Sequence, residues 1–410
     1  MGIIKKNILK NTLIMIMLFT LLFASSDNLS DGKIVNNDDE INVNNPIAVF
    51  VSPPFAMKDN YYLYADSSNR VLQIAEFVDP SNMTNVAAYP THQSAVIINL
   101  LIEDNLLYMV INKVEEIGFE IVNITNILNP TYLGHYIANS SRIHFNIDPL
   151  QASRYEVQKQ NDYCFLLADG IYQVSNDTIR IVDCSDIENL TESARYEPVN
   201  NNIQDFAVKN EYLYVLTNNE QELEIVNITD KSNPNKTIAW RTNEYFYGIN
   251  YYQDYMFMYS DFNIKMYNIL DPLSPVLVNT FSKFTDEHDR FSDLVFWEHY
   301  LAAMKRDFIF VYDIYDLTSN QSISEFECLD KGSGRFLVGL YNNDLLYVSR
   351  ATEFEDRSLF IFDVSDAANL VKIYPEGVAN KIPLPSYAYI IYFFVSCVVI
   401  QRIVTRKSKK

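Results

Sequence analysis

Oxygen-bearing side chains recur at regular spacing along the 410-residue chain, and their types suit either turn formation or cation binding. The stretch "QELEIVNITDKSNP" (221–234) shows the pattern, in which an alternating strand runs into Asn227, Thr229, Asp230 and Pro234. Asx and Ser/Thr side chains hydrogen-bond backbone groups nearby, and proline fixes φ, so a structural turn needs no ligand. Calcium instead takes about six to eight oxygens, often with a bidentate carboxylate and a glycine at the bend. The motif contains no glycine, which favours the turn over a repeated calcium loop.

The same phrase appears seven times, each copy centred on one key polar residue after a strand: Glu76, Asn123, Asp183, Asn227, Asn268, Asp313 and Asp363. Successive keys lie 47, 60, 44, 41, 45 and 50 residues apart. A repeat of roughly 40–50 residues built from strands is typical of a β-propeller blade. Four of the seven keys are Asn or Glu, which is a second argument against calcium.

Each repeat contains four predicted strands that position the key residue. An inner strand such as "DFAVKN" (205–210) precedes an aromatic strand such as "EYLYVL" (211–216), the motif strand, and an outer strand such as "PVLVNTF" (275–281). Alternating Val, Ile, Tyr and Phe between Asn, Asp, Ser and Pro is strand and turn chemistry. The sequence therefore predicts an all-β fold, a seven-bladed propeller over 46–377. An ordinary β-sandwich is the alternative.

The repeated phrase resembles the LVIVD repeat, which occurs in surface or secreted β-propellers, and the resemblance covers about residues 47–377. It implies a propeller fold and an exposed location, and it implies no catalytic residue. One segment, "PIAVFVS" (46–52), is an extra predicted strand beyond the four that each of the seven blades needs. We expect it to form the inner strand of the first blade or to pair along the last blade and close the ring.

The two ends of the chain carry the signals of export and anchoring. Residues 1–26 combine three lysines with an apolar run and small residues, as in a signal peptide, with an uncleaved anchor as the alternative, and 27–45 form a polar linker. After a juxtamembrane linker (378–385), the 19 residues 386–404 would span about 28 Å as a helix, close to the thickness of a bilayer core. The basic tail 405–410 then predicts a cytoplasmic C-terminus and an extracellular propeller.

Charge supports this topology. Three of the 32 Lys and Arg residues precede Asp27 and five follow Gln401, whereas all 52 acidic residues lie between, so the intervening portion carries a net charge of −28. Such a surface repels nucleic acid and anionic membranes, and nucleic-acid partners are excluded.

An extracellular location gives two further expectations about modification. Cys164 and Cys184 lie on adjacent predicted strands, where they form a disulfide or remain as two buried thiols. Asn-x-Ser/Thr sequons predict N-glycosylation. Those at Asn123 and Asn227 are discounted because the repeated turn motif itself contains the sequence Asn-Ile-Thr at these positions. The remaining sequons are at Asn28, Asn82, Asn139, Asn176, Asn189, Asn235 and Asn320.

No motif for catalysis, phosphate binding or metal binding stands out, and we expect no cofactor. The histidines are scattered: His92, His135, His144, His288 and His299. Inner-strand residues align roughly in one column at the channel, but their mixed types argue against a metal ring: Phe55, Asn99, Asp205, Gly248 and Asp293. The tyrosine-rich stretch 243–255 is a candidate exposed patch for a protein or glycan ligand.

The sequence thus favours a membrane-anchored, extracellular and non-catalytic module for binding, adhesion or protein interaction. One alternative is a surface hydrolase or lyase at the channel mouth, because propeller enzymes assemble sites from single residues on several blades. A structural component of a cell-envelope complex is the other alternative.

Overall fold

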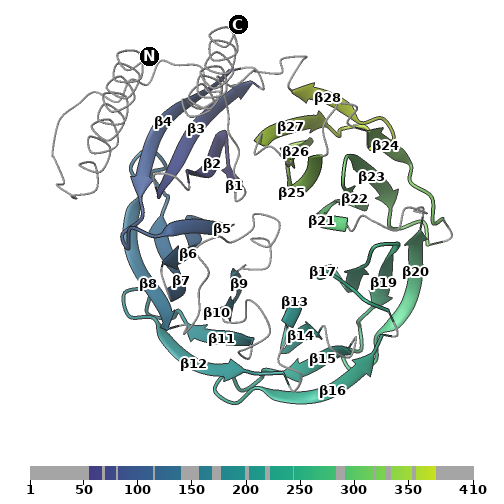
Figure 1. The fold of residues 1–410 in the computed structure, drawn as a ribbon, viewed down its shortest axis with the longest axis horizontal. Helices are drawn as coiled ribbons and strands as arrows, with labels where there is room; N and C mark the ends of the chain where they lie inside the picture. The colour runs from purple at the N-terminus through teal and green to yellow at the C-terminus, as the bar shows by residue number, and fades with distance from the viewer. Residues whose placement is uncertain are drawn as a thin grey trace, which may run out of the picture. The chain divides into compact units, whose positions relative to one another are not determined.

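Seven four-stranded antiparallel sheets contain all the strands of the described residues, which confirms the all-β seven-bladed prediction (Figure 1). The computed structural model describes residues 55–66, 70–79, 82–113, 116–139, 157–168, 177–198, 203–217, 222–242, 244–282, 291–317, 319–327, 334–352 and 357–374. All of these belong to one unit, Asn44–Lys410. Within each sheet, strands that follow one another in sequence also pair, so every blade is a simple meander from the inside outward.

The first four blades comprise β1 to β16. Their bounds are β1 Phe55–Lys58, β2 Tyr61–Asp66, β3 Val71–Asp79 and β4 Asn82–Pro90 in blade 1; β5 Val96–Glu103, β6 Leu106–Lys113, β7 Glu116–Asn123 and β8 Thr131–Asn139 in blade 2; β9 Val157–Gln160, β10 Tyr163–Ala168, β11 Thr178–Asp183 and β12 Thr191–Tyr196 in blade 3; and β13 Ile203–Lys209, β14 Tyr212–Thr217, β15 Glu222–Asn227 and β16 Asn235–Arg241 in blade 4.

The last three blades comprise β17 to β28. Their bounds are β17 Gly248–Tyr252, β18 Tyr255–Tyr259, β19 Asn263–Asn268 and β20 Val276–Ser282 in blade 5; β21 Phe291–Trp297, β22 Tyr300–Lys305, β23 Phe308–Asp313 and β24 Ser324–Glu327 in blade 6; and β25 Gly334–Asn342, β26 Leu345–Thr352, β27 Arg357–Asp363 and β28 Val371–Tyr374 in blade 7.

Burial explains why the sequence is most apolar in the middle of each blade. The second strand of blade 4, β14, is buried at all but its first residue, because neighbouring blades cover both of its faces. The outer strand β16 alternates between exposed and half-buried residues, as expected where only one face is covered. The cores therefore lie between blades, and each blade contributes residues to two of them.

The hairpin between the first and second strands begins in the same conformation in all seven blades. Its first turn residue has a positive φ near 50°, a region that Asn and Asp tolerate better than most residues and that two-residue hairpins require. Five of the seven turns accordingly place Asn or Asp there, and the full set is Asp59, Asp104, Asn161, Asn210, Gln253, Glu298 and Asn343.

The ring closes through its innermost strands. Each inner strand contacts that of the next blade, and β25 of blade 7 contacts β1 of blade 1 (Figure 1). Blade 1 has its inner strand in β1, which begins at Phe55 and follows the segment 46–52. That segment lies outside the described residues, and so do 1–26, 27–45, 378–385, 386–404 and 405–410. Within the described ranges, no helix is long and apolar enough to cross a membrane.

Candidate interaction surface

The key residues of the repeat build the turn between the third and fourth strands. In six blades the key side chain accepts a hydrogen bond from the backbone N–H two residues on, at 2.8–2.9 Å. The second Asx residue does the same in several blades, as when Asp230 accepts the N–H of Ser232 at 3.0 Å. The Ser185 hydroxyl and N–H also hold the pKa of Asp183 below its ordinary value. These oxygens therefore serve the turn itself. Among the described residues, no three His, Cys, Asp or Glu side chains are placed to hold a metal ion.

Blade 1 departs from this pattern at Glu76. The Phe77 N–H binds the Asn60 carbonyl at 2.7 Å, the bond that the residue after the key makes in every blade. Pairing of β3 with β4 nevertheless continues past Glu76 to Asp79 opposite Asn82, so the chain turns three residues later. Glu76 thus occupies the key position in register without making the key turn.

The channel residues join neighbouring blades. Asn99, Asp205, Gly248 and Asp293 face equivalent positions of their second strands, and Phe55 is displaced by one residue. Three of these, Asn99, Asp205 and Asp293, lie at β-bulges.

Each of the two aspartates accepts the N–H of its own next residue and one N–H from the next inner strand. Asp205 receives that second bond from Ile249 at 2.8 Å, and Asp293 receives it from Gly339 at 3.0 Å. They are therefore links between blades. Burial raises the pKa of Asp293 to about 7, although the Gly339 and Leu294 N–H groups oppose this rise.

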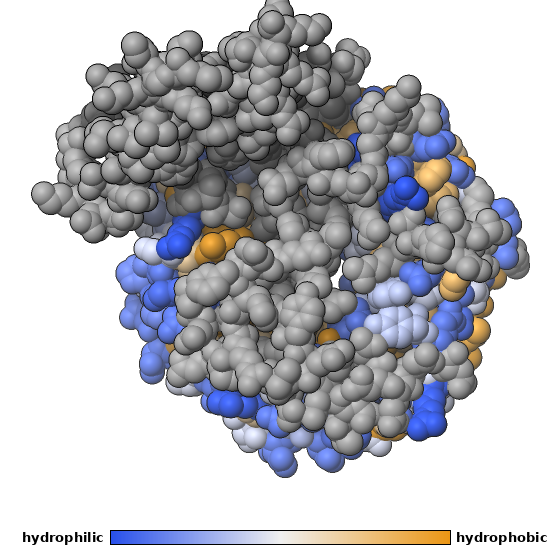
Figure 2. All heavy atoms as spheres, viewed as in Figure 1, coloured by the Kyte–Doolittle hydropathy of each residue, from blue (hydrophilic) through white to orange (hydrophobic). Residues whose placement is uncertain are grey.

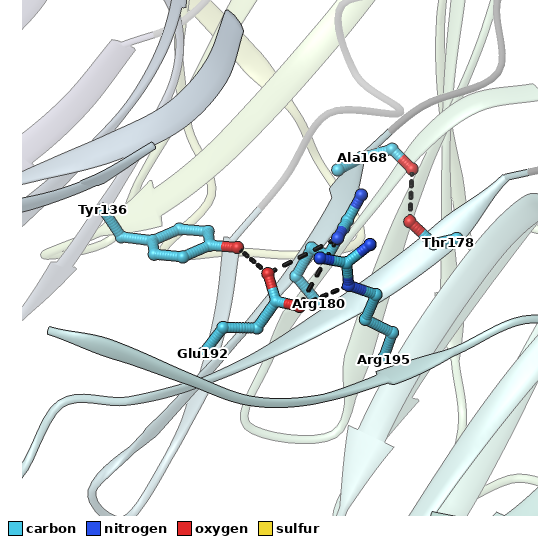
Figure 3. Close-up of polar contacts among 6 residues, drawn as sticks. All are labelled: Tyr136, Ala168, Thr178, Arg180, Glu192 and Arg195. Atoms are coloured by element: carbon cyan, nitrogen blue, oxygen red, sulfur yellow. Dashed lines mark hydrogen bonds and ion pairs between the residues drawn. The ribbon is translucent and has the colours of Figure 1, made fainter. Parts of the chain in front are cut away.

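The junction between blades 2 and 3 contains a partly buried ionic cluster that the sequence did not reveal (Figure 3). Arg180 of β11 lies 3.4 Å from both carboxylate oxygens of Glu192 of β12, and Arg195 also binds this carboxylate. The Tyr136 hydroxyl of β8 donates to Glu192 across the junction. Burial alone would raise the pKa of Glu192, but Tyr136, Arg195 and Arg180 together hold it below its ordinary value. A similar contact joins blades 3 and 4, where the Tyr196 hydroxyl donates to Glu224, which also pairs with Lys236 at 3.0 Å.

Other candidate residues from the sequence are placed as follows. His92 and His135 come together around Tyr132, whose hydroxyl lies 2.5 Å from His135 Nδ1, and His299 stacks on Tyr315. His144 and His288 lie outside the described residues.

Cys164 and Cys184 are both buried free thiols. Cys164 pairs with Val182, two residues before Cys184, and the Cys184 thiol donates to the Val182 carbonyl at 3.6 Å.

Three of the sequon asparagines, Asn189, Asn235 and Asn320, are exposed. Asn82 and Asn139 lie at the start of β4 and the end of β8. Asn28 and Asn176 are outside the described residues.

The tyrosine-rich stretch 243–255 does not form one patch. Tyr245 and Tyr247 precede β17 and pack against each other, with ring centroids 4.8 Å apart. Tyr252, at the other end of β17, stacks on Phe296. Tyr251 is the only tyrosine of the stretch that is strongly exposed among its described residues.

A different apolar surface lies on blades 5 and 6, at the turns after the third strands and the start of the outer strands. We call it the blade 5–6 surface, and its members are Leu270, Val276, Leu277, Tyr315, Leu317 and Ile323. Leu270 is 71% exposed and Val276 is 61% exposed, so these side chains are largely uncovered. Hydrophilic side chains prevail in the face shown in Figure 2, with hydrophobic ones at the right-hand rim, where Figure 1 places β20.

Two hydrogen bonds join the halves of the blade 5–6 surface. The Gln253 amide, in the first hairpin of blade 5, lies 3.3 Å from the Tyr315 hydroxyl of blade 6. The Asn279 amide of β20 donates to the Ser319 carbonyl of blade 6 at 2.9 Å. The turn of blade 6 is also longer, because Asp313 and the start of β24 are eleven residues apart, against eight for Asn268 and β20. Blade 6 therefore extends its turn along β20.

Comparisons with known proteins identify the repeat. Residues 202–242, which contain blade 4, match the family model of the LVIVD repeat. No curated protein matches the chain. Among solved structures, a functionally unknown protein from Desulfotomaculum acetoxidans has a TM-score of 0.57 at 9% identity, covering 77% of this chain and 96% of its own. Hsv2 of Kluyveromyces lactis has a TM-score of 0.52 at 12% identity, covering 76% and 93%. The computationally designed Ika8 protein has a TM-score of 0.52 at 11% identity, covering 77% and 84%. At these identities the likeness concerns the fold alone.

Proposed function

From an LVIVD repeat in blade 4 and a seven-bladed ring, we propose that this LVIVD-repeat propeller is a protein-interaction module held at the outer face of a membrane. The blade 5–6 surface carries the proposal. Exposed apolar area is stabilised by burial at about 25 cal/mol per Å², and contiguous patches of this kind on soluble domains mark interaction sites. The polar groups that recur in the repeat are used by turns and blade links, which leaves recognition to the positions where blades differ.

The location rests on the sequence. A signal-like segment at 1–26, an apolar segment at 386–404 and a basic tail support an extracellular propeller, and the acidic charge of the intervening residues suits a solvated surface. Glycosylation at the exposed residues Asn189, Asn235 and Asn320 would be compatible with this topology.

Two measurements on intact cells that produce the full chain test the proposal. Protease added outside should remove an epitope placed in the propeller and leave a small membrane-bound fragment. Cross-linking at the cell surface should recover a partner that depends on the propeller. Protection of residues 47–377 from the protease would refute the extracellular location. Failure to recover any cross-linked partner at the cell surface would refute the interaction role.

A further inference from the structure

The outer strand of blade 5 combines absence of charge with exposed apolar side chains. β20 (Val276–Ser282) contains no charged residue, and its first two residues are exposed hydrophobic side chains. The outer strands β4 and β8 also lack Asp, Glu, Lys and Arg, whereas β12, β16, β24 and β28 carry charges. Charged side chains on an edge strand discourage pairing with another chain, and of the three uncharged outer strands β20 is the one whose described residues include large exposed hydrophobic side chains.

The accessible part of this edge is its beginning. The Thr280 N–H is bound by the Asn279 side chain at 2.8 Å, and Asn279 also holds the loop of blade 6. The segment from Val276 to Val278 precedes that contact and lies beside Leu270 of the preceding turn. Apolar side chains and the outer backbone of β20 are thus available together at one end of the strand.

Acidic side chains surround the apolar side chains. Asp271, Asp316, Glu325 and Glu327 are exposed in the turns and outer strand next to them. The sequence has no Lys or Arg between Lys265 and Lys283, nor between Arg306 and Lys331. Along these two stretches the exposed apolar side chains therefore have only carboxylates as charged sequence neighbours, and we call these four carboxylates the acidic rim. A second copy of this chain would bring like charges together, which disfavours self-association through this surface.

We propose that the blade 5–6 surface binds an extended segment of another protein in which apolar residues alternate with Lys or Arg. The apolar side chains pack on Leu270, Val276 and Leu277, and the cations meet the acidic rim. The backbone of the segment pairs with the start of β20, in the manner of strand addition. This inference rests on the proposed interaction role and assigns it a surface and a partner chemistry.

Peptide binding to the full chain in detergent, measured by fluorescence anisotropy, tests the inference. The probes are an eight-residue peptide alternating Lys and Val and a matched peptide alternating Glu and Val. We expect the Lys/Val peptide to bind at least tenfold more tightly, and its affinity to fall as NaCl is raised from 50 to 500 mM, since salt screens exposed charges. Equal binding of the two peptides would overturn the proposal.

Variants locate the binding surface. The double variant Leu270→Ser/Leu277→Ser should weaken Lys/Val binding at least tenfold with little effect on folding, because both side chains are exposed. Leu128→Ser is the matched control, since Leu128 is an exposed leucine in the corresponding turn of blade 2. Unchanged peptide affinity in the double variant would overturn the surface assignment, and cell-surface cross-linking that persists in this variant would show that the interaction role stands without it. Binding of the native protein and the double variant to phosphatidylcholine vesicles is measured separately. If the double variant loses vesicle binding but keeps peptide binding, the surface binds a membrane and the proposal is overturned.

Discussion

Asp293→Asn is expected to flatten the pH dependence of stability in the propeller. The Asp293 carboxylate links blade 6 to blade 7 through the Gly339 N–H, and burial raises its pKa from 3.8 to about 7. Between these two values the folded protein keeps a proton that the unfolded chain has released. The free energy of unfolding therefore falls as pH rises from about 4 to about 7 and is level above that.

The size of the effect follows from the pKa difference. At about 1.4 kcal/mol per pKa unit, a rise from 3.8 to about 7 corresponds to on the order of 4 kcal/mol. This value is an upper limit, because the residue keeps some exposure toward the channel. An amide fits this position, since Asn99 occupies the corresponding bulge of blade 2 and accepts the Leu100 N–H at 2.6 Å. The Asn variant should therefore fold and lose the titration, together with one of the two N–H bonds, because the amide has a single acceptor oxygen.

Urea unfolding at several pH values from 4.5 to 8, followed by tryptophan fluorescence, measures the effect. Trp297 lies at the end of β21, the strand that carries Asp293, and is one of two tryptophans in the chain. The variant should gain stability relative to the native protein as pH rises. Asp104→Asn, in an exposed hairpin turn of blade 2, is the control for loss of a carboxylate outside a blade junction. Parallel pH curves for the native protein and Asp293→Asn would show that the raised pKa is wrong.

Three other outcomes are expected. Glu192→Gln should lower the melting temperature at neutral pH, and the difference should shrink in acid, because the lowered pKa of Glu192 gives stability that is lost as pH falls through that pKa. Asn227→Ala should cost about 1 kcal/mol in urea unfolding, whereas Glu76→Ala should cost less because Glu76 makes no key turn; equal costs would contradict the role of the turn. Cys164 and Cys184, which are buried free thiols, should react with a thiol reagent once the unreduced protein is denatured, and resistance to labelling would show a disulfide instead.

The blades were predictable from the sequence because their determinants are local. A key side chain binds a backbone N–H only two residues along the chain, as Asn227 does with Thr229. The turn can therefore be predicted from the residues of the repeat alone. The aromatic strands are likewise recognised by composition, because blades cover both faces of each second strand. The prediction weakened at Glu76, where strand pairing beyond the key displaced the turn.

Contacts between blades were not predictable, because they join residues far apart in sequence. Tyr136 and Glu192 are 56 residues apart, and Asp293 and Gly339 are 46 apart. The channel column was identified by alignment, but its role in linking blades depends on the bulges that aim each carboxylate at the next inner strand. The tyrosine stretch misled for a related reason, since one short strand places its two ends on opposite faces of the ring.

The departures between blades are the more informative guide to function. A ring of similar blades needs the same turns and the same packing in each repeat, so selection for folding acts alike on all seven. The long turn of blade 6 and the exposed apolar start of the outer strand of blade 5 serve no such common need, and both lie at the blade 5–6 surface. Exposed Leu270 and Val276 contribute little to the folded state when uncovered, and an edge without charge carries a risk of unwanted pairing. Because these side chains add little to folding and add risk in solution, they are the reason for proposing a partner that covers them.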